Sequence, residues 1–375
     1  MDEQFEATDR YRMRLNVLFE KHELSLQTTM AEKEQIYGEL AYDNPCLILY
    51  QYRAPTKQNF YNLLTNTTVL TNPKRFNDIF DSYLYCNKDY FESIFSSLDV
   101  NVIRQLVNTL RERELSQEEV ATWGLRSGLE VLKRLSEIPK EEVEDKFFNK
   151  FDKVKAEGWE GFCRYVKAFA GTFLEGVRIS CFSEVGDSPL MWGQYADSGR
   201  GFCIRYKVKP FLNKAMCKRC GRLETTCEGK PAILSLLPVI YRSERFDCAR
   251  VVERYYDYFM ANMYQVKNDF STHDMLEAYK VACFKSNVWS YEREWRLILE
   301  YSEGVPDYFG AQVFLPDAIY LGPKIEEADE VLLVQTINNM KQTLGYELPI
   351  YRMVSNWGQR YYILEAEEYR VRRHY

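Results

Sequence analysis

The segment YEREWRLIL, residues 291–299, combines strand-forming residues with four charged side chains near its start. Side chains alternate between the two faces of a strand, so Glu292, Glu294 and Arg296 are predicted to share one face. The other face is predicted to carry Arg293, Trp295 and Leu297. A strand that enters a packed core rarely begins with this much charge on one face. The segment therefore predicts either an ion-paired sheet edge or a strand end that opens into a cleft.

These glutamates leave two interpretations open. In the structural one, Glu294 pairs with Arg296 along the same face of the strand. In the functional one, a fixed and partly desolvated carboxylate binds a substrate hydroxyl and stabilises positive charge that develops on a neighbouring carbon. The flanking Tyr291 and Trp295 would supply the apolar surroundings that such a carboxylate needs.

Size and composition limit the class of protein. The chain has 375 residues, of which 46% are hydrophobic, so we expect one large domain with insertions or two domains. The formal net charge of −6 does not favour long-range attraction to nucleic acid or to an anionic membrane. The first ten residues, MDEQFEATDR, are acidic and polar, and no long apolar run follows. We therefore expect a cytoplasmic protein without a membrane segment.

Ten cysteines are present, and most lie among apolar neighbours, which predicts buried free thiols rather than disulfides. The stretch CKRCGRLETTC differs, because Cys217 and Cys220 have zinc-ligand spacing and Cys227 follows closely. Cys203 or Cys248 could supply a fourth ligand. No second CxxC or HxxxH motif follows, so the sequence favours a reduced loop without metal over a zinc site.

Hydrophobic periodicity outlines the order of the elements. Residues 7–40 predict a helix that is either packed or an exposed arm for a partner, and 86–175 are mainly helical with a capping box at Ser116 and Glu119. Strands are expected at 46–53, in TVLT, at both ends of 177–208, in LPVIYRSER, in YEREWRLIL and in DAIYLGPKI. Further helices are expected at 57–64, 251–280 and 325–343, and a short strand at 349–354.

Several common catalytic motifs are absent from the sequence. It has no GxSxG and only three histidines, none of them in a motif, which argues against a Ser-His-Asp hydrolase. It also lacks a P-loop and a GxGxxG motif. Gly199 and Gly201, on either side of Arg200, predict a close approach of the backbone to a neighbouring strand or to a ligand.

An ordered set of short segments between about Leu49 and Ile325 is distinctive: LYQYR, FNDIFD, ISCFSE, LMWGQYADSGRGFCIRY, VIYRSE, YEREWRLI and IYLGP. In this order they resemble an uncharacterised bacterial family, domain of unknown function 2971. That resemblance implies no activity.

The order of elements is also similar to the ADP-ribosyltransferase fold. In that fold, a first strand bears Arg or His, a central strand bears Ser-x-Ser or Tyr, and a later strand bears a catalytic Glu. The first strand here offers Arg53 or Gln51. SCFS falls at the central strand, and Glu292-Arg293-Glu294 falls at the catalytic one.

This second resemblance implies NAD as the substrate. Glu294 would bind the ribose 2′-hydroxyl and stabilise the oxocarbenium ion as nicotinamide leaves, and Glu292 would orient or deprotonate the acceptor. The remaining roles fall to residues on the other strands and on the aromatic helix. Ser180 or Ser183 would brace the ribose, Arg53 or Gln51 would bind the adenosine ribose or diphosphate, and Trp192 and Tyr195 would stack on the nicotinamide ring.

We therefore expect an α+β protein with a split, mostly antiparallel sheet of the ADP-ribosyltransferase type. The predicted parts are an N-terminal helical segment (1–44), a core (45–85 and 176–325), a helical insertion (86–175) and a C-terminal helix and strand (326–375). The expected function is NAD-dependent ADP-ribosyl transfer or NAD glycohydrolysis, as in a bacterial toxin or a phage-defence effector. The alternatives are a nucleotide-binding or sensor module without catalysis and a scaffold that binds a partner protein through the N-terminal helix.

Overall fold

A computed structural model describes most of the chain. The described residues are 2–20, 43–46, 48–89, 92, 100–122, 129–208, 215–216, 230–231, 236–249, 281–300, 306–345, 347–356, 358, 360 and 362–370. The predicted helix at 251–280 lies outside them.

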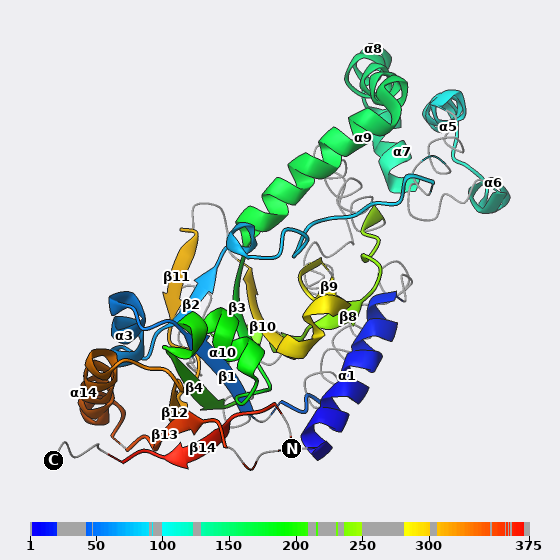
Figure 1. The fold of residues 1–375 in the computed structure, drawn as a ribbon. Helices are drawn as coiled ribbons and strands as arrows, with labels where there is room; N and C mark the ends of the chain where they lie inside the picture. Colours follow the sequence, from blue (N-terminus) through cyan, green and yellow to red (C-terminus); the bar gives the residue numbers. More distant parts are fainter. Residues whose placement is uncertain are drawn as a thin grey trace.

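The core is an α+β structure built on one ten-stranded sheet within the described residues (Figure 1). Its strands are β1 (Ile48–Arg53), β2 (Thr68–Thr71), β3 (Val177–Ser183), β4 (Phe202–Lys207), β7 (Leu236–Pro238), β10 (Glu294–Glu300), β11 (Tyr308–Ala311), β12 (Pro316–Leu321), β13 (Ile350–Val354) and β14 (Glu365–Glu368). The order is β11-β2-β3-β1-β4-β12-β13-β14, and β10 joins β3 to β7. Every described pairing in this sheet is antiparallel except that of β12 with β13. The predicted α+β, mostly antiparallel architecture is confirmed.

Strand β3 is the branch point of the sheet. Along one edge it pairs with β10 over its whole length, from Val177 to Ser183. Along the other edge, β1 pairs with it only at Ser183 and β2 only at Ile179. The sheet therefore divides on this side of β3, and Ser183 lies where β1, β3 and β10 meet.

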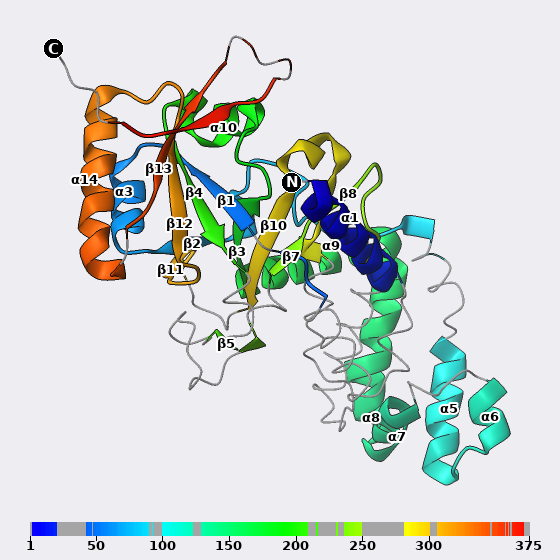
Figure 2. The same cartoon turned by 90° about the horizontal axis from the view of Figure 1, so that it is seen from below.

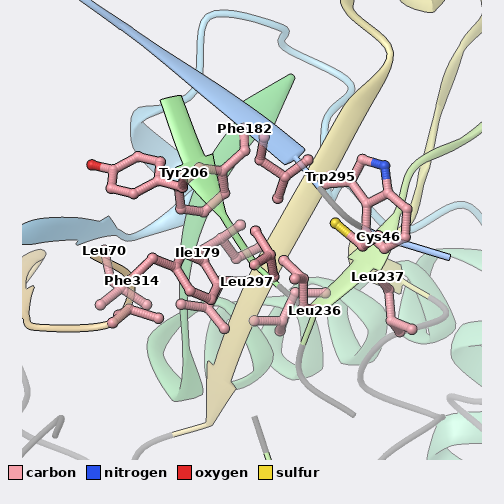
Figure 3. Close-up of a cluster of buried hydrophobic side chains, with 14 of the residues drawn as sticks. Cys46, Leu70, Ile179, Phe182, Tyr206, Leu236, Leu237, Trp295, Leu297 and Phe314 are labelled. Carbon is pink, nitrogen blue, oxygen red and sulfur yellow. The ribbon is translucent and has the colours of Figure 1, made fainter. Parts of the chain in front are cut away.

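Helices cover both faces of the sheet. Helices α3 (Lys57–Leu64) and α14 (Glu327–Leu344) lie side by side on one face, and α10 (Pro189–Tyr195) covers the end of β1 on the other (Figures 1 and 2). The largest group of buried side chains lies along β3 and β10 and includes Ile179, Phe182, Trp295 and Leu297 (Figure 3). Burial of such apolar surface is the main stabilising term of the fold.

The N-terminal helix α1 (Asp2–Glu20) is packed against the core. Tyr11, Leu15 and Phe19 are buried in the main core cluster, and the Tyr11 ring stacks on Trp295 at 6.3 Å. Of the two possibilities predicted for this segment, the described part is therefore a packed helix.

A group of helices extends from one end of the sheet (Figures 1 and 2). It comprises α5 (Val100–Glu112), α6 (Gln117–Thr122), α7 (Leu129–Glu137), α8 (Lys140–Val143), a π-helical turn (Glu144–Phe148) and α9 (Asn149–Gly176). These helices have a hydrophobic cluster of their own, which includes Val107, Leu135 and Phe148. The predicted capping box is confirmed, since Ser116 N donates to the Glu119 carboxylate and Glu119 N donates to Ser116 Oγ.

Helix α9 runs into β3 without a loop, because β3 begins at the residue after Gly176. Arg178 is fully buried at this junction, and its guanidinium donates to the carbonyl oxygens of Glu175 and Pro306. The last turn of the helix is thereby fixed to the first residues of the strand.

The predicted close approach at Gly199 and Gly201 is to a neighbouring strand. A Cβ on Gly201 would lie 2.0 Å from the carbonyl oxygen of Arg53 in β1. Gly322, in the IYLGP segment, donates its N–H to Gly201 O at 2.8 Å. Two of the distinctive sequence segments are therefore packed together by their backbones.

The remaining elements are short. They are the 3₁₀ turns Pro73–Arg75, Asp197–Gly199 and Asn287–Glu292 and the strands β5 (Ala215–Met216), β6 (Lys230–Pro231), β8 (Ile240–Arg242) and β9 (Phe284–Ser286). No described helix is long and apolar enough to cross a membrane.

Candidate functional site

The charged start of YEREWRLIL, residues 291–299, differs in one respect from the predicted strand. Glu292 ends a 3₁₀ turn, Arg293 adopts a left-handed conformation with φ of 44°, and β10 begins only at Glu294. Regular alternation therefore fails at Arg293. The side chains of Glu292 and Glu294 nevertheless converge, because both contact the ammonium group of Lys285.

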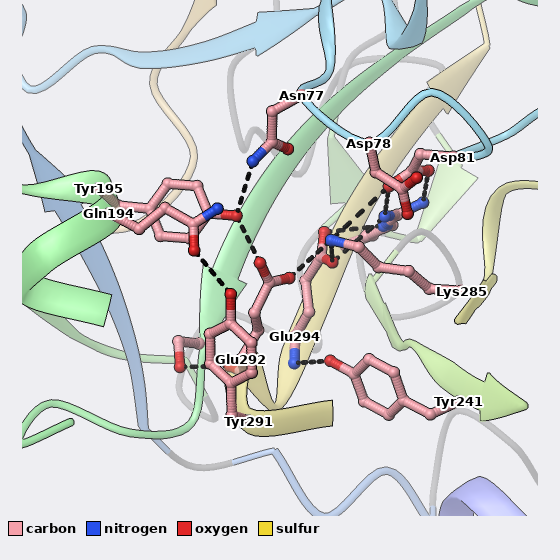
Figure 4. A network of polar contacts seen from close by, with 12 residues as sticks. Asn77, Asp78, Asp81, Gln194, Tyr195, Tyr241, Lys285, Tyr291, Glu292 and Glu294 are labelled. Carbon is pink, nitrogen blue, oxygen red and sulfur yellow. Dashed lines mark hydrogen bonds and ion pairs between the residues drawn. The ribbon is translucent and has the colours of Figure 1, made fainter. Parts of the chain in front are cut away.

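Five charged side chains form a buried network that we call the Lys285 cluster: Asp81, Lys285, Glu292, Glu294 and Arg296 (Figure 4). Lys285 Nζ donates to Glu292 at 2.6 Å and to Glu294 at 3.0 Å. Arg296 donates from Nε to Glu294 at 2.8 Å and from Nη1 to Asp81 at 2.7 Å. The cluster thus links β9, β10 and the turn that carries Asp81.

The charges in this cluster do not balance. Among the described residues it contains three carboxylates and two cations, and each of the five side chains is at most 5% exposed. Burial raises the pKa of Glu292, and the nearby charge of Glu294 raises it further. Burial also opposes ionisation of Glu294, but Arg296 and Lys285 outweigh it and lower the pKa of Glu294 to about 2. Of the two glutamates, Glu292 is therefore the one whose carboxylate takes up a proton more readily.

Glu292 is also the member of the cluster that leads toward the surface. The Tyr195 hydroxyl donates to Glu292 and accepts from Asn77 Nδ2 at 3.3 Å (Figure 4). Beside them, Tyr291 donates to Gln194 at 2.6 Å. Tyr195 is half-buried and Asn77 is exposed, so a hydrogen-bonded path from Glu292 through Tyr195 to Asn77 connects the buried carboxyl to a solvent-accessible side chain. A carboxyl of raised pKa in such a position can take up or release a proton.

The opposite face of the same segment forms a second network, which we call the Glu184 cluster: Asp9, Arg12, Glu184 and Arg293, with Trp295. Glu184 is fully buried and accepts from Arg293 at 2.6 Å and from Trp295 Nε1 at 2.5 Å. Arg12 of helix α1 lies 3.4 Å from it and also donates to Val239 O. This cluster has two carboxylates and two guanidinium groups, and it attaches α1 to the core.

The predicted nucleotide-binding residues of the first strand lie on a different face of the sheet from Glu294. Tyr50 pairs with Ser183, and Ser183 pairs with Glu294, so these three side chains share one face. Gln51, next along β1, points to the other face, where its side-chain Nε2 donates to Ser180 Oγ at 3.1 Å. The structure therefore brings Gln51 and Ser180 together but not next to Glu294.

Strand alternation places Arg53 on the Gln51 face as well. Ser183 lies next to the Lys285 cluster, where its hydroxyl donates to the main-chain oxygen of Glu292 at 2.6 Å and accepts from Val185 N. It positions the backbone of Glu292. Trp192 is only 1% exposed and donates to Gly186 O, whereas Tyr195 contacts Glu292 directly.

The predicted weak zinc candidates Cys217, Cys220 and Cys227 lie outside the described residues. Cys203 and Cys248, named above as possible fourth ligands, are buried. Among the residues that the structure describes, no group of three or more His, Cys, Asp or Glu side chains could hold a metal ion.

Sequence reasoning missed Lys285, Asp81 and Asn77. Lys285 was detectable in principle as a lone lysine in the apolar stretch VACFKSNVW, because a lysine among buried residues needs carboxylate partners. Asp81 lies 215 positions before its partner Arg296, and no local pattern connects them.

The fold and this site define an α+β protein with a branched antiparallel sheet and a buried acidic cluster at the branch point. A family model described as a protein of unknown function, DUF2971, matches residues 191–297, which include most of α10, all of β4 and the first four residues of β10. The resemblance to DUF2971 predicted from the sequence is confirmed over these residues. No curated protein and no solved structure matches the chain.

Proposed function

We propose that the chain is an NAD-dependent ADP-ribosyltransferase or NAD glycohydrolase that uses the Lys285 cluster. The observation that carries the proposal is the surplus carboxyl at Glu292, which is buried, has a raised pKa and is linked through Tyr195 to the surface. The sequence resemblance to that class of enzymes supplies the substrate. A toxin or an anti-phage effector is the role that such an activity would serve.

The proposed chemistry gives Glu292 and Glu294 different roles. Departure of nicotinamide breaks its bond to the ribose C1′, the base leaves with the electron pair, and C1′ becomes cationic. A cluster with one more anion than cations favours that charge in the transition state. The acceptor oxygen then bonds to C1′ and gives its proton to Glu292, acting as general base. Glu294, held by Arg296 and Lys285, contributes fixed negative charge.

Release of nicotinamide from NAD by the purified chain, with and without cell extract, tests this proposal. Glu292→Gln removes the proton acceptor and should lower the rate by roughly 100-fold or more. Glu137→Gln, which changes an exposed glutamate paired with Arg134, is the matched control and should leave the rate unchanged. Lack of turnover in the unaltered chain, or equal rates for both variants, would contradict the proposal.

A second candidate is a nucleotide-binding or sensor module that does not catalyse. The placement of Gln51 and Ser180 on the face opposite Glu294 favours it, since the predicted ribose and phosphate contacts then lie apart from the carboxylates. In this case NAD should raise the melting temperature without being consumed. Binding of a partner protein through residues 1–40 stays a proposal, and loss of the association on deletion of that segment would test it.

A further inference from the structure

A pocket of about 270 Å³ has Lys285 among its lining residues. It is bordered by the turn that carries Phe80 and Tyr83, by β8 and the residues after it, and by β9. Lys285 borders both this pocket and the Lys285 cluster, but its ammonium is occupied by carboxylates. Among the described residues that border the pocket, the cations that remain for a ligand are Arg242 and Arg245.

Arg245 is held rigidly in place without a carboxylate. Its Nη2 donates to the main-chain oxygens of Tyr83 at 2.8 Å and of Leu84 at 3.0 Å. Its guanidinium lies between 5.1 and 5.4 Å from the ring centroids of Phe80, Tyr83 and Tyr85. No described acidic side chain forms an ion pair with it, in contrast to Arg242, which pairs with Glu20. Arg245 therefore offers a fixed positive charge without a direct ion pair to a described carboxylate, although Glu244 also borders the pocket.

The pocket also offers flat apolar surfaces. Phe80 and Tyr83 are 57% and 56% exposed, so part of each aromatic side chain is accessible to a ligand. Behind them, the rings of Phe246 and Phe284 stack with centroids 4.4 Å apart and planes 3° from parallel, and both residues border the pocket. A flat ring could therefore be stacked against aromatic surface within reach of the Arg245 guanidinium.

We propose that this pocket binds an organic phosphate that carries a flat ring, the chemical class of nucleotides. Arg245 keeps Nε and Nη1 as charged donors for phosphate oxygens, since its two hydrogen bonds to main-chain oxygens both come from Nη2, and Phe80 and Tyr83 match the face of a base. Arg242, at the same border, adds a second guanidinium. The proposal goes beyond the catalytic one, because it concerns side chains other than Glu292 and Tyr195, and it would hold for a protein that binds a nucleotide without consuming it.

Calorimetric titration of the full chain with adenosine 5′-monophosphate, adenosine and ribose 5-phosphate tests this inference. The monophosphate should bind at least tenfold more tightly than either of the other two, since only it has both the ring and the phosphate. Arg245→Gln should weaken the monophosphate at least tenfold and leave adenosine unchanged. Arg134→Gln, at an exposed ion pair on helix α7, is the control and should change neither.

Tyr83→Ala tests the aromatic part of the site separately from the arginine. It also keeps the inference testable if the Arg245 variant does not fold. The Tyr83 side chain is exposed, and its main-chain oxygen, which binds Arg245, is kept. This change should weaken the monophosphate and leave ribose 5-phosphate unaltered. Equal binding of the monophosphate and adenosine, or no binding of any probe, would overturn the inference. Nicotinamide release is measured separately, so this result and the catalytic proposal can fail independently.

Discussion

The Lys285 cluster and the Glu184 cluster are formed by opposite faces of one short segment, and they differ in charge balance. The Glu184 cluster pairs two carboxylates with two guanidinium groups and joins helix α1 to the core. The Lys285 cluster has three carboxylates for two cations and reaches partly exposed side chains through Tyr195. Glu184 is as buried as the glutamates of the Lys285 cluster, so burial of a carboxylate alone does not distinguish a structural network from a candidate site.

The difference identifies which charges are available for chemistry. In a balanced network each charged group is compensated, and removal of one leaves another buried and unpaired. In an unbalanced network one group is already uncompensated, and its removal relieves repulsion. Carboxyl groups whose pKa is shifted in an unbalanced network are typical of functional sites. The following predictions test this distinction.

The largest effect is expected at Arg296, which is fully buried and contacts both Asp81 and Glu294. Arg296→Met leaves three carboxylates with Lys285 alone, and should lower the free energy of unfolding by about 4 kcal/mol. Urea denaturation against Arg134→Met, an exposed control, measures it. A loss below about 1 kcal/mol would show that the cluster tolerates further imbalance.

A smaller loss is expected at the balanced network. Glu184→Gln keeps the shape of the side chain but leaves Arg12 and Arg293 without their shared carboxylate. The free energy of unfolding should fall by about 3 kcal/mol, and helix α1 should become more accessible to protease. If limited proteolysis cuts α1 at the same rate in both proteins, Glu184 does not hold that helix.

The smallest effect, and the opposite sign, is expected at Glu292. Its pKa in the folded state lies above the ordinary value of 4.5, so between those two values the folded state binds the proton more tightly than the unfolded state. The unaltered protein should therefore lose stability relative to Glu292→Gln as the pH rises from 4.5. The loss is about 1.4 kcal/mol for every pH unit that separates the pKa of the folded state from that of the unfolded state. Denaturation at several pH values between 4 and 8 measures the difference, and a difference independent of pH would contradict it.

Glu294 provides the matched comparison, because its pKa is lowered and the sign reverses. Its ionised form stabilises the folded state above pH 4.5, and this contribution is lost as the pH falls toward about 2. The stability advantage of the unaltered protein over Glu294→Gln should accordingly shrink in acid. An advantage that stayed constant between pH 5 and pH 3 would rule out the assigned ion pairs.

Local patterns in the sequence predicted much of the fold. The apolar run before Arg53, the helix from Lys57 and the alternation in residues 294–299 all correspond to elements of the structure. The left-handed Arg293 was not predictable, because its conformation depends on Glu184 and Asp9, which are distant in sequence. The pairing of Glu294 with Arg296, which the sequence predicted, is observed, but the sequence did not indicate that Lys285 and Asp81 join them.

The sequence also could not reveal on which face of the sheet each predicted contact lies. Resemblance alone places Gln51 and Ser180 in the same cleft as Glu294. The face of each residue depends on the register between β1, β3 and β10, and a shift of one residue moves every side chain to the other face.

The direct passage from α9 into β3 connects the helical end of the molecule to the candidate site. From Trp159 to Gly176 the helix is regular, Arg178 clamps its last turn, and the far end of β3 is Ser183, which holds the backbone of Glu292. Because this part of α9 continues directly into β3, a displacement of the helix would act first on the strand whose end holds the backbone of Glu292.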